Sequence, residues 1–122
     1  FGAMVQVGAA LATGNVAVLR APADVLAALA SMPAALRGLI RPDMRGDATD
    51  CAAVLHEGGA TALRALAEEA ARWDGPIRPV FSATVEALAS GATDYPLEFL
   101  LAERSISTNT AAAGGNASLM SL

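Results

Sequence analysis

The sequence predicts an α/β domain, a partial three-layer fold in which helices cover a parallel sheet. Helical runs alternate with short apolar runs, and continuous apolar runs of this length are typical of buried parallel strands. Turns that contain glycine, proline and polar residues separate the runs, and no internal repeat is evident. The 122 residues are close to the usual size of one domain, so we expect a single hydrophobic core.

The first part of the chain predicts a helix, a strand and a second helix. Apolar residues recur at helical spacing over residues 3–12, and Gly14-Asn15 tolerates the left-handed conformation that ends a helix. Residues 16–19 (VAVL) predict a short buried strand. Asp24 can cap the helix that follows, and Pro33 predicts a kink or a fresh start within it.

The middle of the chain predicts a second strand and an amphipathic helix. Residues 41–50 predict a loop, residues 52–55 a strand, and residues 56–59 the turn that leaves it. In the helix that follows, apolar residues share one face and charged residues point to water. The apolar face holds Leu63, Leu66, Ala67 and Ala70, and the solvated face holds Glu68, Glu69 and Arg72.

The last part of the chain predicts a third strand, two short helices and a terminal segment of a different kind. Residues 77–81 predict the strand, and residues 83–90 and 95–103 predict the helices. Residues 105–110 (SISTNT) are β-like and predict a flap strand. The composition of residues 111–122, mostly small and polar, is equally typical of a solvated tail and of a backbone that lies closely along another surface, and the apolar end at Leu119 and Met120 favours the second.

Charge and composition argue against contact with nucleic acid and against a membrane span. The formal net charge is -4 and no segment clusters arginine, so the footprint of a nucleic-acid binder is missing. The uncharged residues 1–19 are broken by Thr13-Gly14-Asn15, which favours a buried helix and strand over a span. A single cysteine, Cys51, cannot form an internal disulfide and is compatible with a reducing cytoplasm.

The Gly58-Gly59 turn lies between a strand and a helix, where dinucleotide-binding folds hold a pyrophosphate. The run from Glu57 to Ala62 (EGGATA) lacks the G-x-G-x-x-G spacing. Glu57 would also place a carboxylate close to any phosphate. We therefore expect plain turn chemistry here and no cofactor bound by this chain.

The reactive side chains predict no catalytic group and no metal site. Cys51 has only acidic and apolar neighbours in the sequence, and these do not activate a thiol. Cys51 opens a predicted strand, and His56 falls on its opposite face, so the two do not form a nucleophile and base pair. One cysteine and one histidine are too few for a zinc site, and the only paired carboxylates, Glu68 and Glu69, lie on the solvated helix face.

Three stretches of the chain resemble a known family. Residues 1–22 (FGAMVQVGAALATGNVAVLRAP) resemble the helix and strand of the aldehyde dehydrogenase cofactor domain, where the pattern ALAxGNTVVLKP is typical. Residues 51–81 resemble the strand, glycine turn and helix that follow there. Residues 103–122 (ERSISTNTAAAGGNASLMSL) are similar to the C-terminal motif of the long proline utilisation A proteins.

The resemblance implies the C-terminal, aldehyde-dehydrogenase-like domain of a bifunctional proline-catabolic flavoprotein. In that family a proline dehydrogenase domain with FAD and a glutamate semialdehyde dehydrogenase domain with NAD precede a domain that is regarded as non-catalytic. The resemblance implies that this domain packs on the dehydrogenase domain, helps to seal the semialdehyde channel and sends its terminal motif towards the active site. The implied docking positions are Arg104, Ser105, Ser107, Thr108, Asn109, Gly114, Gly115 and Asn116, with Leu119 and Met120 as an apolar anchor.

The departures from the family pattern agree with a silent domain. The chain has Arg20-Ala21-Pro22 where an active aldehyde dehydrogenase has a Lys-Pro pair whose lysine helps to bind the adenosine ribose. It has Glu57 and Gly58 where the family places a glycine and a serine over the pyrophosphate. The catalytic domain, with its cysteine and glutamate, is absent from this sequence.

These observations lead to one main hypothesis and two alternatives. We expect residues 1–94 to form a degenerate Rossmann-like unit and residues 95–122 to form a helix, a flap strand and a tail. The main hypothesis is a non-catalytic, channel-sealing domain that binds no cofactor, in a parent that holds FAD and NAD. The alternatives are a small nucleotide- or metabolite-binding regulatory domain and a fragment of an active aldehyde dehydrogenase. The expected partner is the aldehyde dehydrogenase domain of the same polypeptide, and the isolated chain can self-associate through the flap.

Overall fold

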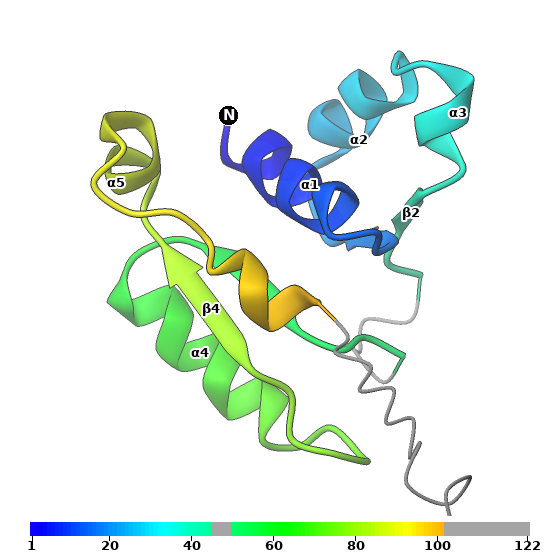
Figure 1. Ribbon diagram of the computed structural model, residues 1–122. Coiled ribbons are helices and arrows are strands. Elements are labelled where there is room, and N and C mark those ends of the chain that lie inside the picture. The colour runs from blue at the N-terminus through cyan, green and yellow to red at the C-terminus, as the bar shows by residue number, and fades with distance from the viewer. Residues whose placement is uncertain (45–49, 102–122) are drawn as a thin grey trace, which may run out of the picture.

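The chain folds as alternating helices and short strands (Figure 1). The computed structural model describes residues 1–44 and 50–101. The elements are α1 (Gly2–Ala12), β1 (Ala17–Leu19), α2 (Ala23–Ala30), α3 (Ala34–Arg37), β2 (Ile40–Pro42), β3 (Val54–Glu57), α4 (Ala60–Ala70), β4 (Val80–Ala83), α5 (Val85–Ser90) and the 3₁₀ helix η1 (Leu97–Leu100). β1 pairs in parallel with β2, and β3 pairs in parallel with β4. The α/β composition is therefore confirmed, but the described strands form two two-stranded sheets where the sequence predicts one.

The first sheet shares one hydrophobic cluster with α1 and α2. Val7 of α1, Ala17 and Leu19 of β1, and Leu29 of α2 are buried together. Ala17 and Leu19 point to the same face because side chains alternate along a strand, so both helices cover that face. Val18 points to the opposite face and is exposed.

Glycine and proline set the ends of several elements in this half. Gly14 adopts φ +76°, a left-handed conformation, and α1 ends just before it, as predicted. α3 begins directly after Pro33, so this proline marks a fresh start and not a kink. The predicted cap at Asp24 is wrong, because the N-cap residue of α2 is Pro22. Asp24 lies in the first turn instead, where its negative charge favours the helix N-terminus.

The second sheet has helices on both of its faces. In Figure 1, α4 lies behind β4 and η1 lies in front of it. The aromatic rings of Phe81 on β4 and Phe99 on η1 are 5.7 Å apart. Ala83, Leu88 and Tyr95 form a buried cluster that also includes Ala9 of α1. This half of the molecule is thus a three-layer arrangement on a small scale.

The helix α1 joins the two halves. Val7 belongs to the first cluster and Ala9 to the second, and residues two positions apart lie on nearly opposite sides of a helix. The Gln6 side chain also donates a hydrogen bond of 3.1 Å to Leu55 O on β3. An uncharged helix therefore packs against both sheets. Within the described residues, no helix is long and apolar enough to cross a membrane.

Several predicted strand bounds are wrong by two or three residues. β3 runs from Val54 to Glu57, so it continues into the predicted turn. β4 begins at Val80, and the predicted strand residue Ile77 is fully exposed. Residues 40–42 form β2 where the sequence predicts the start of a loop. Strands this short carry a weak local signal, because the partner strand decides which residues pair.

The two helices predicted near the end of the described chain differ in how well they agree with the structure. The helix predicted over residues 83–90 is confirmed as α5. Thr84 Oγ1 accepts a hydrogen bond from the N–H of Ala87 at its start, and Gly91 ends it at φ +70°. The helix predicted over residues 95–103 is shorter than expected, because η1 makes little more than one 3₁₀ turn.

Candidate functional site

A cavity of about 940 Å³ lies between the two sheets. β1 and β3 both line it, and the exposed side chain of Val18 faces it. Leu66 of α4 and Trp73, which follows α4, close another side. The cavity also collects most of the reactive side chains that the sequence singles out. These are Arg20, Cys51, His56 and Glu57, together with Asn15 and Asp43.

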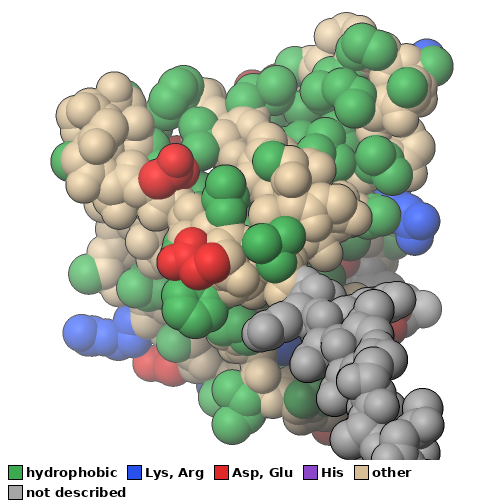
Figure 2. Space-filling view, viewed as in Figure 1, with side chains coloured by type: hydrophobic (Ala, Val, Ile, Leu, Met, Phe, Trp, Pro, Cys, Tyr) green, Lys and Arg blue, Asp and Glu red, His purple; other side chains and the backbone are tan. Residues whose placement is uncertain are grey.

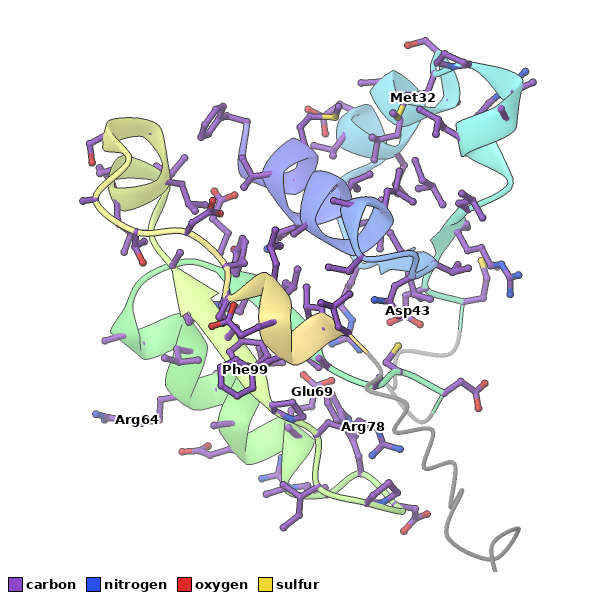
Figure 3. All side chains as sticks on the ribbon, viewed as in Figure 1. Met32, Asp43, Arg64, Glu69, Arg78 and Phe99 are labelled. Carbon is purple, nitrogen blue, oxygen red and sulfur yellow. The ribbon has the colours of Figure 1, made fainter. Side chains whose placement is uncertain are left out.

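Arg20 connects the two halves of the chain at this cavity. Its Nε lies 3.1 Å from Asp43 Oδ2, just after β2, and its Nη1 lies 2.7 Å from Glu69 Oε1 on α4. Both carboxylates point towards the same space (Figure 3). The hydrogen bond to Glu69 is the main reason why the pKa of Arg20 is raised, while desolvation opposes it and Asp43 adds to it. The sequence does not predict this ion pair, although Glu69, with 42% of its side chain exposed, keeps the predicted contact with water.

The Gly58-Gly59 turn is built around a carboxylate. Gly58 has φ +155°, and a Cβ at this position would lie 2.9 Å from Cε1 of His56, so the turn requires glycine. The Glu57 carboxylate lies against Gly2, in the space that a side chain at residue 2 would occupy. A negative charge at this place stabilises the N-terminus of α1. The same charge would repel a phosphate group.

His56 and Cys51 both line the cavity, and each contributes to local structure. His56 Nδ1 lies 3.0 Å from Oγ of Ser82, its register partner on β4. Cys51 does not open a strand as predicted, because β3 begins three residues later at Val54. The backbone carbonyl of Cys51 accepts a hydrogen bond of 3.1 Å from Arg78 Nε. This contact joins the segment before β3 to the segment before β4.

Gln6 and Tyr95 form a polar link that the sequence does not predict. Gln6 Nε2 lies 3.2 Å from the Tyr95 hydroxyl, and that hydroxyl donates to His56 O at 2.9 Å. Burial raises the pKa of Tyr95, the hydrogen bond from Gln6 opposes this shift, and the charge of Glu57 adds to it. Two features of the sequence could have indicated this link. Gln6 is the one polar side chain of its helix, and Tyr95 is the only tyrosine.

The part of the chain that the structure describes offers no cluster of three or more His, Cys, Asp or Glu side chains that could hold a metal ion. The predicted docking motif lies outside the described residues. It comprises Arg104, Ser105, Ser107, Thr108, Asn109, Gly114, Gly115, Asn116, Leu119 and Met120. The docking role of these residues stays a prediction.

No protein-family model matches this sequence, but several characterised proteins are similar to it. The bifunctional protein PutA of Rhizobium meliloti is 39% identical over 119 residues, which cover 96% of this chain. The bifunctional PutA proteins of Escherichia coli (strain K12) and Salmonella typhimurium are 49% and 44% identical, each over 70 residues and 57% of this chain. The chain is a homologue of one region of PutA.

The PutA relatives are much longer than this chain. It spans 10% of the length of the Rhizobium meliloti PutA and 5% of the length of the other two. Because the first match covers 96% of the chain, both sheets and the cavity between them fall within the PutA-like region. The resemblance to proline utilisation A proteins that the sequence motifs indicate is therefore confirmed.

Proposed function

We propose that this chain is a non-catalytic domain of a bifunctional enzyme that converts proline to glutamate. Homology to PutA over 96% of the chain carries the proposal. In the proposed parent, a proline dehydrogenase domain holds FAD, a semialdehyde dehydrogenase domain holds NAD, and this domain holds neither. It packs on the semialdehyde dehydrogenase domain of the same polypeptide, seals the substrate channel and supports the active site there.

The contacts of the reactive side chains support a structural role. Arg20 is bound by two carboxylates from different elements, and His56 pairs with Ser82 across a strand pair. The Glu57 carboxylate lies against the first turn of α1. A general acid or base acts on a substrate atom within hydrogen-bond reach, whereas each of these groups holds two elements of the fold together.

We further assign the fold to a degenerate Rossmann-like type related to the aldehyde dehydrogenase cofactor domain. The parallel strand pairs, and the glycine turn that joins β3 to α4, support this relation. In this proposal residues 1–94 form the Rossmann-like unit, and residues 95–122 supply the helix, flap strand and tail that dock on the partner domain. Tyr95 and Leu100 attach the start of this second unit to the first. The parent acts in the cytoplasm, where the Cys51 thiol stays reduced.

The alternative is a small nucleotide- or metabolite-binding regulatory domain, for which the cavity between the sheets is the candidate site. The cavity is half open to solvent, and its polar lining includes Arg20, His56 and Glu57. Titration of the isolated chain with NAD, followed by its melting temperature, separates the two functions. The proposed function predicts no saturable shift, because Glu57 would repel the pyrophosphate. A dissociation constant below roughly 100 μM, worth more than about 5 kcal/mol, would favour the alternative.

Removal of the domain from its parent tests the proposed function. In a full-length PutA that carries this domain, deletion of residues 1–122 should lower semialdehyde dehydrogenase activity and delay NADH formation from proline. Proline dehydrogenase activity and flavin content should stay at the level of the intact enzyme, and they report that the remaining chain is folded. Unchanged semialdehyde dehydrogenase activity with no delay would refute the role.

A further inference from the structure

One side of α1 is apolar and exposed. Met4, Gly8 and Ala12 follow each other at intervals of four residues, so they form one stripe along the helix. All three are exposed, although α1 contains no charged residue at all. Gln6 is the one polar side chain of α1 and it bonds inward to Leu55 O and Tyr95, so the rest of the helix surface is apolar, and such a surface is normally buried. The stripe therefore has the character of a surface that packs against a further protein.

The 3₁₀ helix η1 extends this apolar surface. Asn15 Nδ2 donates a hydrogen bond of 2.7 Å to Leu100 O, which holds η1 beside the end of α1. Phe99 is 66% exposed and Leu101 is 59% exposed, and Met4 on α1 is 50% exposed. We call the surface formed by Met4, Gly8, Ala12, Phe99 and Leu101 the α1–η1 face. Figure 2 shows this side of the molecule, with hydrophobic side chains scattered between stretches of backbone over α1 and η1.

The charges around the α1–η1 face have one sign. The segments that build and border it, residues 1–19 and 79–101, contain the carboxylates Glu86, Asp94 and Glu98 and no arginine or lysine. In Figure 2 carboxylates lie among the hydrophobic side chains, and arginines lie towards the margins. A partner surface that complements this face is apolar at its centre and carries arginine or lysine at its rim.

The opposite side of the second sheet has a different character. α4 carries Arg64, Glu68 and Glu69, charges of both signs on a helix that has no fully buried residue. Mixed charges on an exposed helix are typical of a solvated surface. Of these two sides, the α1–η1 face is the one suited to docking.

We propose that the α1–η1 face is the surface through which this domain packs on the semialdehyde dehydrogenase domain of its parent, and that the partner surface is apolar with a basic rim. The inference rests on the proposed function and names the surface that performs it. The relatives leave ample chain for such a partner, because this region is 10% of the Rhizobium meliloti PutA.

Oxidation of methionine side chains by hydroxyl radicals in the intact parent tests the face. Met4 lies on the face, while Met44 follows β2 and is 85% exposed. These exposures alone predict less than a twofold difference in oxidation rate between the two methionines. Docking predicts that Met4 reacts several-fold more slowly than Met44. Oxidation of Met4 at a rate comparable with that of Met44 would overturn the α1–η1 face as the docking surface. Unchanged semialdehyde dehydrogenase activity after removal of the whole domain would overturn the proposed function itself.

A pair of matched variants supplies a second, functional measurement. Met4→Glu in the parent places a carboxylate inside the docked surface, and it should lower semialdehyde dehydrogenase activity several-fold. Ala65→Glu adds the same charge on an exposed position of α4 and should leave this activity unchanged. Proline dehydrogenase activity should be unaffected in both variants. Loss of activity in Ala65→Glu but not in Met4→Glu would contradict the assignment of the face.

Discussion

Gln6 and Tyr95 lie 89 positions apart in the sequence, and Gln6 Nε2 donates a hydrogen bond of 3.2 Å to the Tyr95 hydroxyl. The same amide group donates to Leu55 O, and the Tyr95 hydroxyl donates to His56 O. Tyr95 is only 3% exposed, so these bonds form in a dry environment. They tie α1 and the segment before η1 to the backbone of β3, and the stability of the domain should depend on them.

The change Tyr95→Phe tests this link. It keeps the buried ring but removes the hydroxyl group, so Gln6 loses one of its two acceptors and His56 O loses a donor. We expect the free energy of unfolding to fall by about 1–3 kcal/mol, the usual cost of a buried group left without its partner. The measurement is urea unfolding. Ser90→Ala, an exposed change with only a local hydrogen bond, is the control and should cost less than about 0.5 kcal/mol. Equal stability of Tyr95→Phe and the unmodified chain would contradict the role of the link.

The raised pKa of Tyr95 makes stability depend on alkaline pH. Below the ordinary phenol pKa of 10 the side chain is neutral in the folded and the unfolded state, and its contribution is complete. As the pH rises past this value, the unfolded phenol ionises before the buried one, so the free energy of unfolding falls until the folded pKa is reached. The chain has no lysine and one tyrosine, which leaves few other groups to titrate there. Unfolding midpoints from about pH 9 to pH 11 should fall, and Tyr95→Phe should flatten this fall. An identical decline in the variant would show that another group is responsible.

Arg20→Met removes both ion pairs that join β1 to the segment after β2 and to α4. Arg20 is half exposed, and exposed pairs contribute about 0–1 kcal/mol each, so we expect a loss of about 1 kcal/mol. High salt should shrink the difference by screening the pairs. Arg64→Met is the matched control, since Arg64 projects from α4 away from the cavity (Figure 3). Equal effects of the two changes at low salt would show that the Arg20 pairs add nothing measurable.

Two glycines should respond to alanine in opposite directions. Gly58→Ala forces a side chain into a residue with φ +155° and within 2.9 Å of the His56 ring, so we expect a loss of about 1 kcal/mol or more. Gly8 lies within α1 and a Cβ there meets nothing within 4 Å. Gly8→Ala should therefore raise the free energy of unfolding by about 0.5–1 kcal/mol, since alanine favours helix. Thermal or urea unfolding of both variants checks the signs, and a stabilising Gly58→Ala would contradict the turn geometry.

The sequence predicts those parts of the fold that local signals determine. α1 and β1 are placed within one residue, because Gly14 ends the helix and the apolar run 16–19 suits only a short strand. α5 is found as well, with its end before Gly91 as predicted and its start two residues later than predicted. Residues 40–42 gave no such signal. They are a strand because β1 pairs with them, and that pairing is a property of the folded chain.

The candidate site could be predicted only in part. The absence of a phosphate-binding spacing at Gly58-Gly59 and the acidic character of Glu57 are visible in the sequence. The ion pairs of Arg20 are not, because they join residues 23 and 49 positions apart. The place of Glu57 beside Gly2 depends in the same way on how α1 packs against β3. Contacts between distant segments follow from tertiary packing, which helix and strand periodicity does not encode.

The terminal motif, residues 103–122, gives the most direct test of the proposed function. The proposal has this motif act on the neighbouring dehydrogenase domain. Deletion of Asn109–Leu122 from the full-length parent leaves the described part of the chain in place. The measurement is NADH formation from proline in a single reaction, with proline dehydrogenase activity as the control. We expect a lag before NADH appears and lower semialdehyde dehydrogenase activity, while proline dehydrogenase activity stays intact. NADH formation without a lag and at the full rate would contradict the account.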